Sequence, residues 1–403
     1  MHTTEARIED ADNVLVASST ARTDGLIRDF FGSVISVEEL SSGSTDLTRK
    51  TVYLCGDMSG ISGAELGAAA RVFVVPELSH GHEGKPWRPV GLGRVPVRVH
   101  GVGLYYRRFF DLDTDHFGRI RSEHAFQSLT ESTKPGTAHR TGIYLTPVTR
   151  DGDELHFRLL RCSTNLSGPT ENFSATDTRI VEALNQEAAS VFRDQAPLNH
   201  VLAQIYHNTP ITAERKQSKA RISAHADKTK DMPANGIMAF CTFYDRLDKL
   251  HPLTEDAFDH GRNGVSGLTR LHFRLKEPTE VPAGSTLPRQ FTLTLHPHSV
   301  FLMPLSTNRL YTHEIRPSTL DAGSLPTRLG YVVRCSNTEA VHKDGRTFLR
   351  TDRGPVELAP PTPDGLEELR ALYAEENKTQ AHIDYGDRFL FSMNTGDYVA
   401  PRT

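Results

Sequence analysis

Cysteine is scarce in this chain of 403 residues, and long apolar runs are absent from it. The four cysteines are far apart and form no CxxC pair, so their spacing gives no zinc or dithiol redox motif and favours reduced thiols in a cytosolic protein. No stretch of about 18 apolar residues occurs, and the first residues, MHTTEARIEDADN, are polar and acidic. We therefore expect no membrane-spanning segment, no secretory leader and a cytoplasmic protein.

An excess of positive charge is also absent. The formal net charge is −4 and the sequence pI is near 6.6, so no overall basic field would draw the protein onto a phosphate backbone. A nucleotide or nucleic acid is therefore a disfavoured partner, and a small molecule is the expected one. A chain of this length corresponds to one elaborated domain or two closely packed ones, and its oligomeric state is left open.

The apolar pattern predicts an α+β protein that is mainly β. After residue 198, short runs rich in β-branched and aromatic residues alternate with turn-rich connections, which is typical of a sandwich or barrel. Earlier in the chain, β-like runs at 51–55 and 71–78 follow a polar, Ser/Thr-rich segment at 1–48. Two further runs joined by a turn around Gly152 predict a hairpin.

Two segments have the apolar spacing of helices. One is 174–194, for which Ser174 and Thr176 are both candidate N-caps, and the other is 363–377. The chain is then divided into three parts, with 130–197 assignable to either of the first two. These parts are an N-terminal α+β extension at 1–197, a β core at 198–352, and a C-terminal helix with its tail at 353–403.

In the segment ISAHADKTKDMP, His225 and Asp227 are two residues apart. On an extended strand both side chains leave from the same face, which brings one imidazole and one carboxylate together. Two histidines and one carboxylate form the facial triad that binds ferrous iron and leaves positions for a co-substrate and O2. His313, in NRLYTHEIRP, is the candidate third ligand. With 19 histidines in the chain, HxD alone is a weak signal, and a chance match is the alternative.

The run RLGYVVR, which begins fifteen residues after the third candidate ligand, places Arg328 and Arg334 six residues apart. Its β-branched and aromatic content predicts a strand, and the even spacing puts both arginines on one face. Arginine pairs bidentately with carboxylates and keeps its charge, so two inward arginines would bracket a short diacid. The opposite face is apolar, so the arginines face either water or a polar cavity; that face carries Leu329, Tyr331 and Val333.

The order HxD, RLYTHxIxP and RxxxxxR resembles the AlkB-like branch of the Fe(II)/2-oxoglutarate-dependent dioxygenases over residues 198–335. The resemblance implies a double-stranded β-helix, a jelly-roll or cupin-like core, with iron bound by the two histidines and the aspartate. It also implies that Arg328 binds the distal carboxylate of 2-oxoglutarate, with Arg334 near its metal-bound end. The AQIY segment is similar to the family's N-x-Y, so Tyr206 would help to hold the co-substrate, with Gln204 in place of Asn.

Two departures from this family bear on the substrate. Thr229 stands two residues after the metal aspartate, where DNA-repair members usually have an acidic residue that reads the damaged base; base dealkylation is therefore in doubt. The connection between AQIY and HxD is long and basic, and it is either a solvated loop or a seat for an anionic substrate. Its basic residues are Arg215, Lys216, Lys219 and Arg221.

The resemblance implies an enzyme that uses Fe(II), 2-oxoglutarate and O2 to hydroxylate a small polar or anionic metabolite, releasing succinate and CO2. Because Asp227 supplies the metal carboxylate, no position is vacated for a halide, which favours hydroxylation over halogenation. Oxidation or demethylation of a nucleobase, with Trp87 as a stacking group, is the first alternative. A non-catalytic, cupin-like binding module with an accidental triad is the second. The basic connection, 79–96 and 245–268 are candidate substrate lids.

Overall fold

The computed structural model describes residues 5–9, 12–18, 24–130, 137–162, 166–277, 287–386 and 388–403. Over these residues the chain is mainly β with few helices, as predicted. Its two longest helices, α4 (Ala175–Val191) and α6 (Pro363–Lys378), lie in the two predicted segments. Ser174 is the N-cap of α4, because its side chain accepts hydrogen bonds from two amides of the first turn. No helix in the described ranges is both long and apolar enough to span a membrane.

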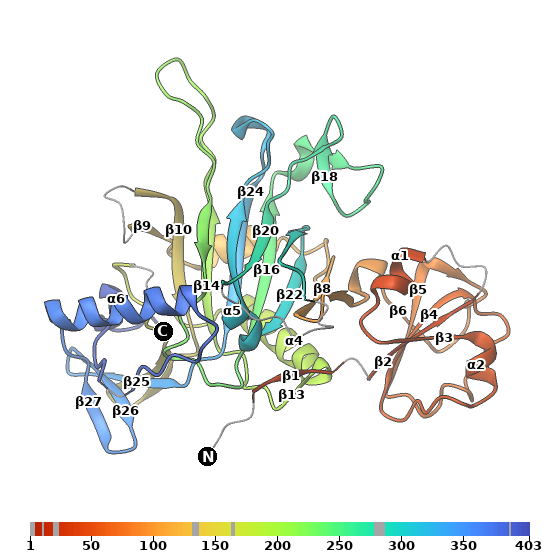
Figure 1. Ribbon diagram of the computed structural model, residues 1–403, viewed down its shortest axis with the longest axis horizontal. Coiled ribbons are helices and arrows are strands. Elements are labelled where there is room, and N and C mark those ends of the chain that lie inside the picture. Colours follow the sequence, from red (N-terminus) through yellow and green to blue (C-terminus); the bar gives the residue numbers. More distant parts are fainter. Residues whose placement is uncertain are drawn as a thin grey trace.

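Five strands between Asn13 and Pro89 form a sheet of their own at one end of the molecule, drawn in red and orange in Figure 1. All its neighbouring strands run parallel, in the order β3 (Ser33–Ser36), β2 (Asn13–Ala17), β4 (Thr51–Asp57), β5 (Arg71–His80) and β6 (Arg88–Pro89). The short helices α1 (Asp24–Asp29) and α2 (Val37–Ser41) lie in the crossovers. The central strands β2 and β4 are almost wholly buried, which explains their continuous apolar sequences NVLVA and TVYLC. Strand β2 lies within residues 1–48, the segment whose composition is polar and rich in Ser and Thr.

The largest sheet has eight antiparallel strands at the centre of Figure 1. Four of its strands precede residue 197 and four follow it, so this sheet spans the predicted boundary between the N-terminal part and the β core. In order they are β7 (Val97–Val99), β8 (Gly103–Tyr106), β22 (Ser299–Pro304), β16 (Ile237–Asp245), β24 (Thr327–Arg334), β14 (His200–Tyr206), β10 (Thr137–Leu145) and β9 (Gln127–Thr130).

A four-stranded antiparallel sheet packs on one face of the large sheet. Its order is β15 (Ile222–His225), β23 (Tyr311–Arg316), β20 (Arg270–Leu275) and β21 (Gln290–Thr294). Side chains of both sheets form one apolar core, to which the large sheet gives Phe240 and Phe301 and the small sheet gives Phe273 and Tyr311. We call the face of the large sheet that lines this core its inner face. The other face packs against α4 in a second core.

A third antiparallel sheet lies beside α6 (Figure 1). It contains the predicted hairpin around Gly152, which is formed by β11 (Thr149–Asp151) and β12 (Glu154–Leu159). Strand β12 of the hairpin pairs with β25 (Thr338–Lys343), which follows the large sheet in the sequence. The sheet then continues through β26 (Arg346–Thr351) and β27 (Gly354–Glu357). The C-terminal helix therefore packs beside a sheet built from two distant parts of the chain.

Candidate metal centre

His225, Asp227 and His313 meet at one end of the small sheet. His225 is the last residue of β15 and pairs with His313 in β23. Asp227 lies beyond the strand in an irregular loop. The strand geometry that the sequence argument assumed for both residues of HxD therefore applies to His225 only. Even so, Oδ1 of Asp227 is 3.4 Å from Nε2 of His225 and 3.8 Å from Nε2 of His313. Ligand atoms about 2.1 Å from one ion and at right angles are about 3 Å apart, so this set fits a metal ion after a small contraction.

Both imidazoles present Nε2 to the shared carboxylate. Nδ1 of His225 lies 2.9 Å from the carbonyl oxygen of Ser223, which is the contact that a metal-binding histidine usually makes with its second nitrogen. The ring of His313 packs against Phe240 and Phe273, and burial lowers the pKa of His313 to about 3. His313 is therefore neutral near pH 7, which is the form that binds metals.

Asp227 is buried and divides its two oxygens between the histidines and Arg334. Nε and Nη2 of Arg334 donate to Oδ2 at 2.9 and 2.6 Å, while Oδ1 faces the histidines. Burial opposes ionisation of Asp227, but the guanidinium holds the pKa of this carboxyl well below its usual range. Asp227 is therefore an anion with one oxygen left for a cation. Arg334 lies against the metal carboxylate itself.

Arg328 lies on the same face of β24 as Arg334, and both are buried, with 4% and 6% of their surface exposed. The arginines therefore face the protein interior rather than bulk water. The guanidinium of Arg328 lies 3.9 Å from the ring centre of Tyr206, in a cation–π contact. Its Nε is a buried donor that has no hydrogen-bond partner among the described residues. A buried charge without a partner is costly, so this position suits an anionic ligand.

Gly330 makes room for the guanidinium of Arg328. A Cβ at this position would lie 2.9 Å from Nη1 and 3.1 Å from Nη2 of Arg328. Gly330 pairs with Gln204 on one side and with Thr242 on the other. The hydroxyl of Tyr206 donates to Oε1 of Gln204 at 3.3 Å, and Oγ1 of Thr242 is buried without a partner in the described part of the chain. The guanidinium of Arg328 thus lies over Gly330, between the strands that carry Gln204 and Thr242. A guanidinium, a side-chain amide and a hydroxyl are donors that fit a carboxylate.

Asn308, in α5 (Leu305–Leu310), is a site residue that the sequence did not reveal. Its Oδ1 accepts from the amide of Asp227 at 2.9 Å, and its Nδ2 donates to the carbonyl oxygen of the same residue at 2.9 Å. Asn308 follows an apolar run within PLSTN, a composition typical of a turn, so only the fold identifies its contact. The reciprocal pair fixes the backbone of the metal carboxylate.

Two residues considered for nucleobase recognition have structural roles. Trp87 is only 8% exposed and belongs to the core of the N-terminal sheet, so the prediction that it stacks on a base was wrong. The segment 79–96 around Trp87 is a candidate lid by its sequence, but burial of the large apolar side chain decided the place of Trp87. Thr229 donates through both its amide and its hydroxyl to Oε1 of Glu376 in α6. Position 229 therefore contacts the C-terminal helix.

The basic connection forms a hairpin that projects from the body of the molecule between β14 and β15 (Figure 1). Backbone hydrogen bonds of 2.8 and 2.9 Å between Thr209 and Ser218 close its stem. Residues 211–217, which include Arg215 and Lys216, are exposed. These observations favour the solvated-loop interpretation for the tip, and its role as a lid stays a prediction.

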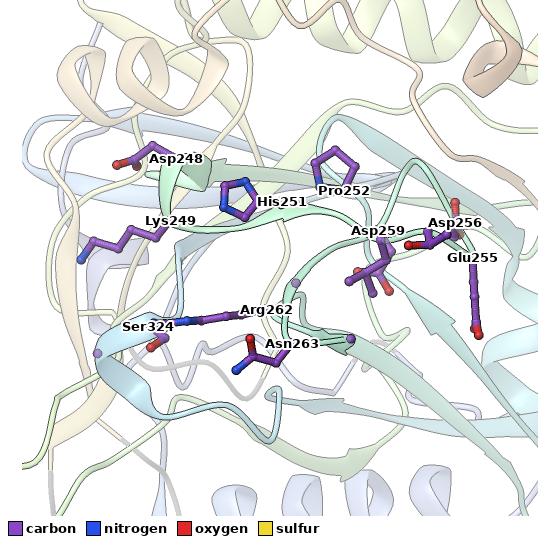
Figure 2. A pocket seen from close by; sticks show the side chains of 15 residues that line it. Asp248, Lys249, His251, Pro252, Glu255, Asp256, Asp259, Arg262, Asn263 and Ser324 are labelled. Atoms are coloured by element: carbon purple, nitrogen blue, oxygen red, sulfur yellow. The ribbon is translucent and has the colours of Figure 1, made fainter.

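The connection 245–268 forms a cleft of about 990 Å³ together with Gly323 and Ser324 (Figure 2). Neither the triad nor Arg328 lines it. Lys249 and Arg262 are outnumbered in its lining by carboxylates, which belong to Asp248, Glu255, Asp256 and Asp259. This charge balance does not favour an anionic metabolite in the cleft.

No protein-family model and no curated protein matches the chain. Among solved structures, a prolyl-4-hydroxylase from Pseudomonas putida is 10% identical with a TM-score of 0.31, over 58% of this chain and 91% of the other. OsALKBH1 is 13% identical with a TM-score of 0.32, over 58% of this chain and 96% of the other. Likenesses this weak carry no argument about activity, so the function is inferred from the site alone.

Proposed function

We propose that this protein is an Fe(II)- and 2-oxoglutarate-dependent oxygenase that hydroxylates a small polar or anionic metabolite. One observation carries the proposal: the inner face of the large sheet holds two buried arginines. One is paired with the carboxylate of a His–Asp–His cluster, and the other has a buried Nε without a hydrogen-bond partner in the described part of the chain. Arg334 fixes the acidic ligand, and Arg328 supplies a buried guanidinium whose Nε has no hydrogen-bond partner among the described residues. A small diacid bound at a metal ion satisfies both requirements.

In this proposal His225, Asp227 and His313 hold the iron, and Arg328 with Gln204 and Thr242 receives the distal carboxylate of the co-substrate. Iron and 2-oxoglutarate together supply the oxidising power, drawn from O2 with release of succinate and CO2.

The protein's own contribution is orientation and exclusion of water. The ring of Tyr206 packs against the guanidinium of Arg328 and helps to orient it. The rings of Phe240 and Phe273 pack against His313 and exclude water from that side of the site. Because Asp227 is present and ionised, the acidic ligand position is filled, which supports hydroxylation over halogenation.

We further propose that the large and small sheets together make the double-stranded β-helix that such oxygenases use. The shared apolar core between them supports this. The nucleobase alternative loses the residue that favoured it, since Trp87 lies in a core. Thr229, which already counted against base dealkylation, is engaged by Glu376. A cupin-like binding module without catalysis remains the competing hypothesis, and it predicts no reaction with O2.

The test is anaerobic addition of Fe(II) and 2-oxoglutarate to the purified chain. We expect a weak visible charge-transfer band that disappears in His225→Ala and requires a higher 2-oxoglutarate concentration in Arg328→Ala. His382→Ala and Arg370→Ala, which alter exposed residues elsewhere, are the matched controls and should retain the band. Absence of the band in the wild-type chain with fresh iron would overturn the proposal and favour the binding module.

The substrate is sought by screening for succinate formation across amino acids, their conjugates and nucleotides. A small polar metabolite should raise succinate formation above the uncoupled rate. Salt-sensitive micromolar binding of a single-stranded oligonucleotide, with oxidation of one of its bases, would replace the metabolite by a nucleic acid.

A further inference from the structure

The last turn of α6 contacts the loop that carries Asp227. Oδ1 of Asn377 accepts from the amide of Ala226 at 2.8 Å and from Nζ of Lys228 at 2.7 Å. The next residue along the loop, Thr229, is bound by Glu376 of the same turn. The last turn of a helix that begins at Pro363 therefore contacts the two residues that flank Asp227.

This loop has no strand partner to hold it. Residues 226–229 lie outside regular secondary structure, yet Ala226 is fully buried and a buried amide needs an acceptor. Two asparagine side chains supply the acceptors for consecutive amides, Asn377 for Ala226 and Asn308 for Asp227. Because peptide groups are planar, fixing these two amides fixes the backbone rotations between His225 and Asp227, and with them the directions of both ligands.

The end of α6 is itself held firmly. Nζ of Lys276, the residue that follows β20, donates to the carbonyl oxygens of Glu376 and Thr379 at 2.7 and 3.1 Å. A cation at this end of α6 also complements the helix dipole. The hydroxyl of Tyr385 donates to Oε2 of Glu376 at 2.7 Å. The turn that carries Asn377 is therefore fixed to the small sheet, which also carries His225 and His313.

We propose that Asn377 is a positioning residue of the metal centre, which holds the peptide group that joins His225 to Ala226 through its side-chain oxygen. This inference rests on the proposed function, since it assigns the C-terminal helix to the metal site. The oxygen is the essential atom, because both of its contacts are accepted hydrogen bonds. Asn377→Asp keeps an acceptor at this place, while Asn377→Leu keeps the approximate shape and removes it.

The experiment measures Mn(II) binding to the metal-free full-length chain by electron paramagnetic resonance of the free ion. Partners that orient metal ligands usually change metal affinity by about 10- to 100-fold when removed, so we expect a loss of that size in Asn377→Leu and in Asn377→Ala. Asn377→Asp should stay within about threefold of the wild type. Glu375→Ala, an exposed change on the same helix, is the matched control and should bind as the wild type does.

Two further readouts separate positioning from general packing. A cooperative thermal unfolding transition should show that metal-free Asn377→Ala is folded at the assay temperature. Co(II) absorption should show altered ligand-field bands in Asn377→Leu and wild-type bands in Asn377→Asp. Undiminished Mn(II) affinity in both Asn377→Leu and Asn377→Ala would overturn the role of Asn377 and leave the proposed function standing, as would equal losses in Leu and Asp variants. Failure of the wild-type chain to bind Mn(II) would overturn both proposals.

Discussion

Replacement of Gly330 by alanine should weaken 2-oxoglutarate binding without unfolding the protein. The new Cβ would lie 2.9 to 3.3 Å from three atoms of the Arg328 guanidinium, and this flexible end of a side chain is what moves. Hydrogen bonds from a charged donor contribute about 1.5–3 kcal/mol, so loss of the guanidinium–carboxylate contact corresponds to about 10- to 150-fold in affinity. The measurement is anaerobic calorimetric titration of 2-oxoglutarate into the chain loaded with Mn(II).

The double variant decides whether the glycine acts through the arginine. Arg328→Ala and the Arg328→Ala, Gly330→Ala pair should bind 2-oxoglutarate equally weakly, because one shared contact is lost only once. Gly60→Ala, whose Cβ meets nothing within 4 Å, is the control for the glycine change. Wild-type affinity in Gly330→Ala, or losses that add in the double variant, would refute the reasoning.

His124 should make stability depend on pH. Burial opposes its charge, but hydrogen bonds to two carboxylates raise the pKa of His124 to about 9, so its stabilisation is complete below about pH 6.5 and is lost as the pH rises through about 9. Urea unfolding of the wild type should lose on the order of 3 kcal/mol over that range relative to His124→Gln, and parallel profiles would contradict this. Asp227→Asn should leave Arg334 buried without an anion and lower the free energy of unfolding of the metal-free chain by about 3–5 kcal/mol. His225→Ala should change that free energy far less, and equal unfolding midpoints for the two variants would count against the buried ion pair. Tyr206→Phe keeps the ring under Arg328 and should change 2-oxoglutarate affinity less than threefold. Tyr206→Ala loses a contact of about 1–2 kcal/mol and should bind about tenfold more weakly in the same titration, and equal effects of the two changes would exclude the cation–π contact.

Local signals in the sequence were enough for some parts of the fold. Helix α4 was predictable because Ser174 caps it and its apolar spacing is internal to the segment. The pairing of β8 with β22 was not, since it joins Tyr106 to Val300 and no local pattern specifies a partner so distant in the sequence. In the N-terminal sheet, β4 and β5 lie at the runs predicted over 51–55 and 71–78. Strand β2 was not predicted, because it is a short apolar run within polar surroundings.

The same distinction applies to the site. The two arginines could be predicted to lie together because even spacing places side chains on one strand face, and β24 keeps that face. The spacing of His225 and Asp227 also brings them together, although Asp227 lies beyond the strand. Asn308 and Asn377 were not found, because each acts on backbone groups that only the folded chain brings to it. An asparagine that satisfies a buried amide has the same composition signal as one in a solvated turn.

The charges around the candidate metal centre explain why the metal and the co-substrate should bind together. The guanidiniums of Arg328 and Arg334 and the carboxylate of Asp227 leave one net positive charge in a buried place, and a divalent cation alone would add to it. A dianion would offset that charge and would meet both the ion and Arg328, so each ligand should bind more tightly in the presence of the other. Because such coupling is reciprocal, the metal should raise 2-oxoglutarate affinity by the same factor by which 2-oxoglutarate raises metal affinity.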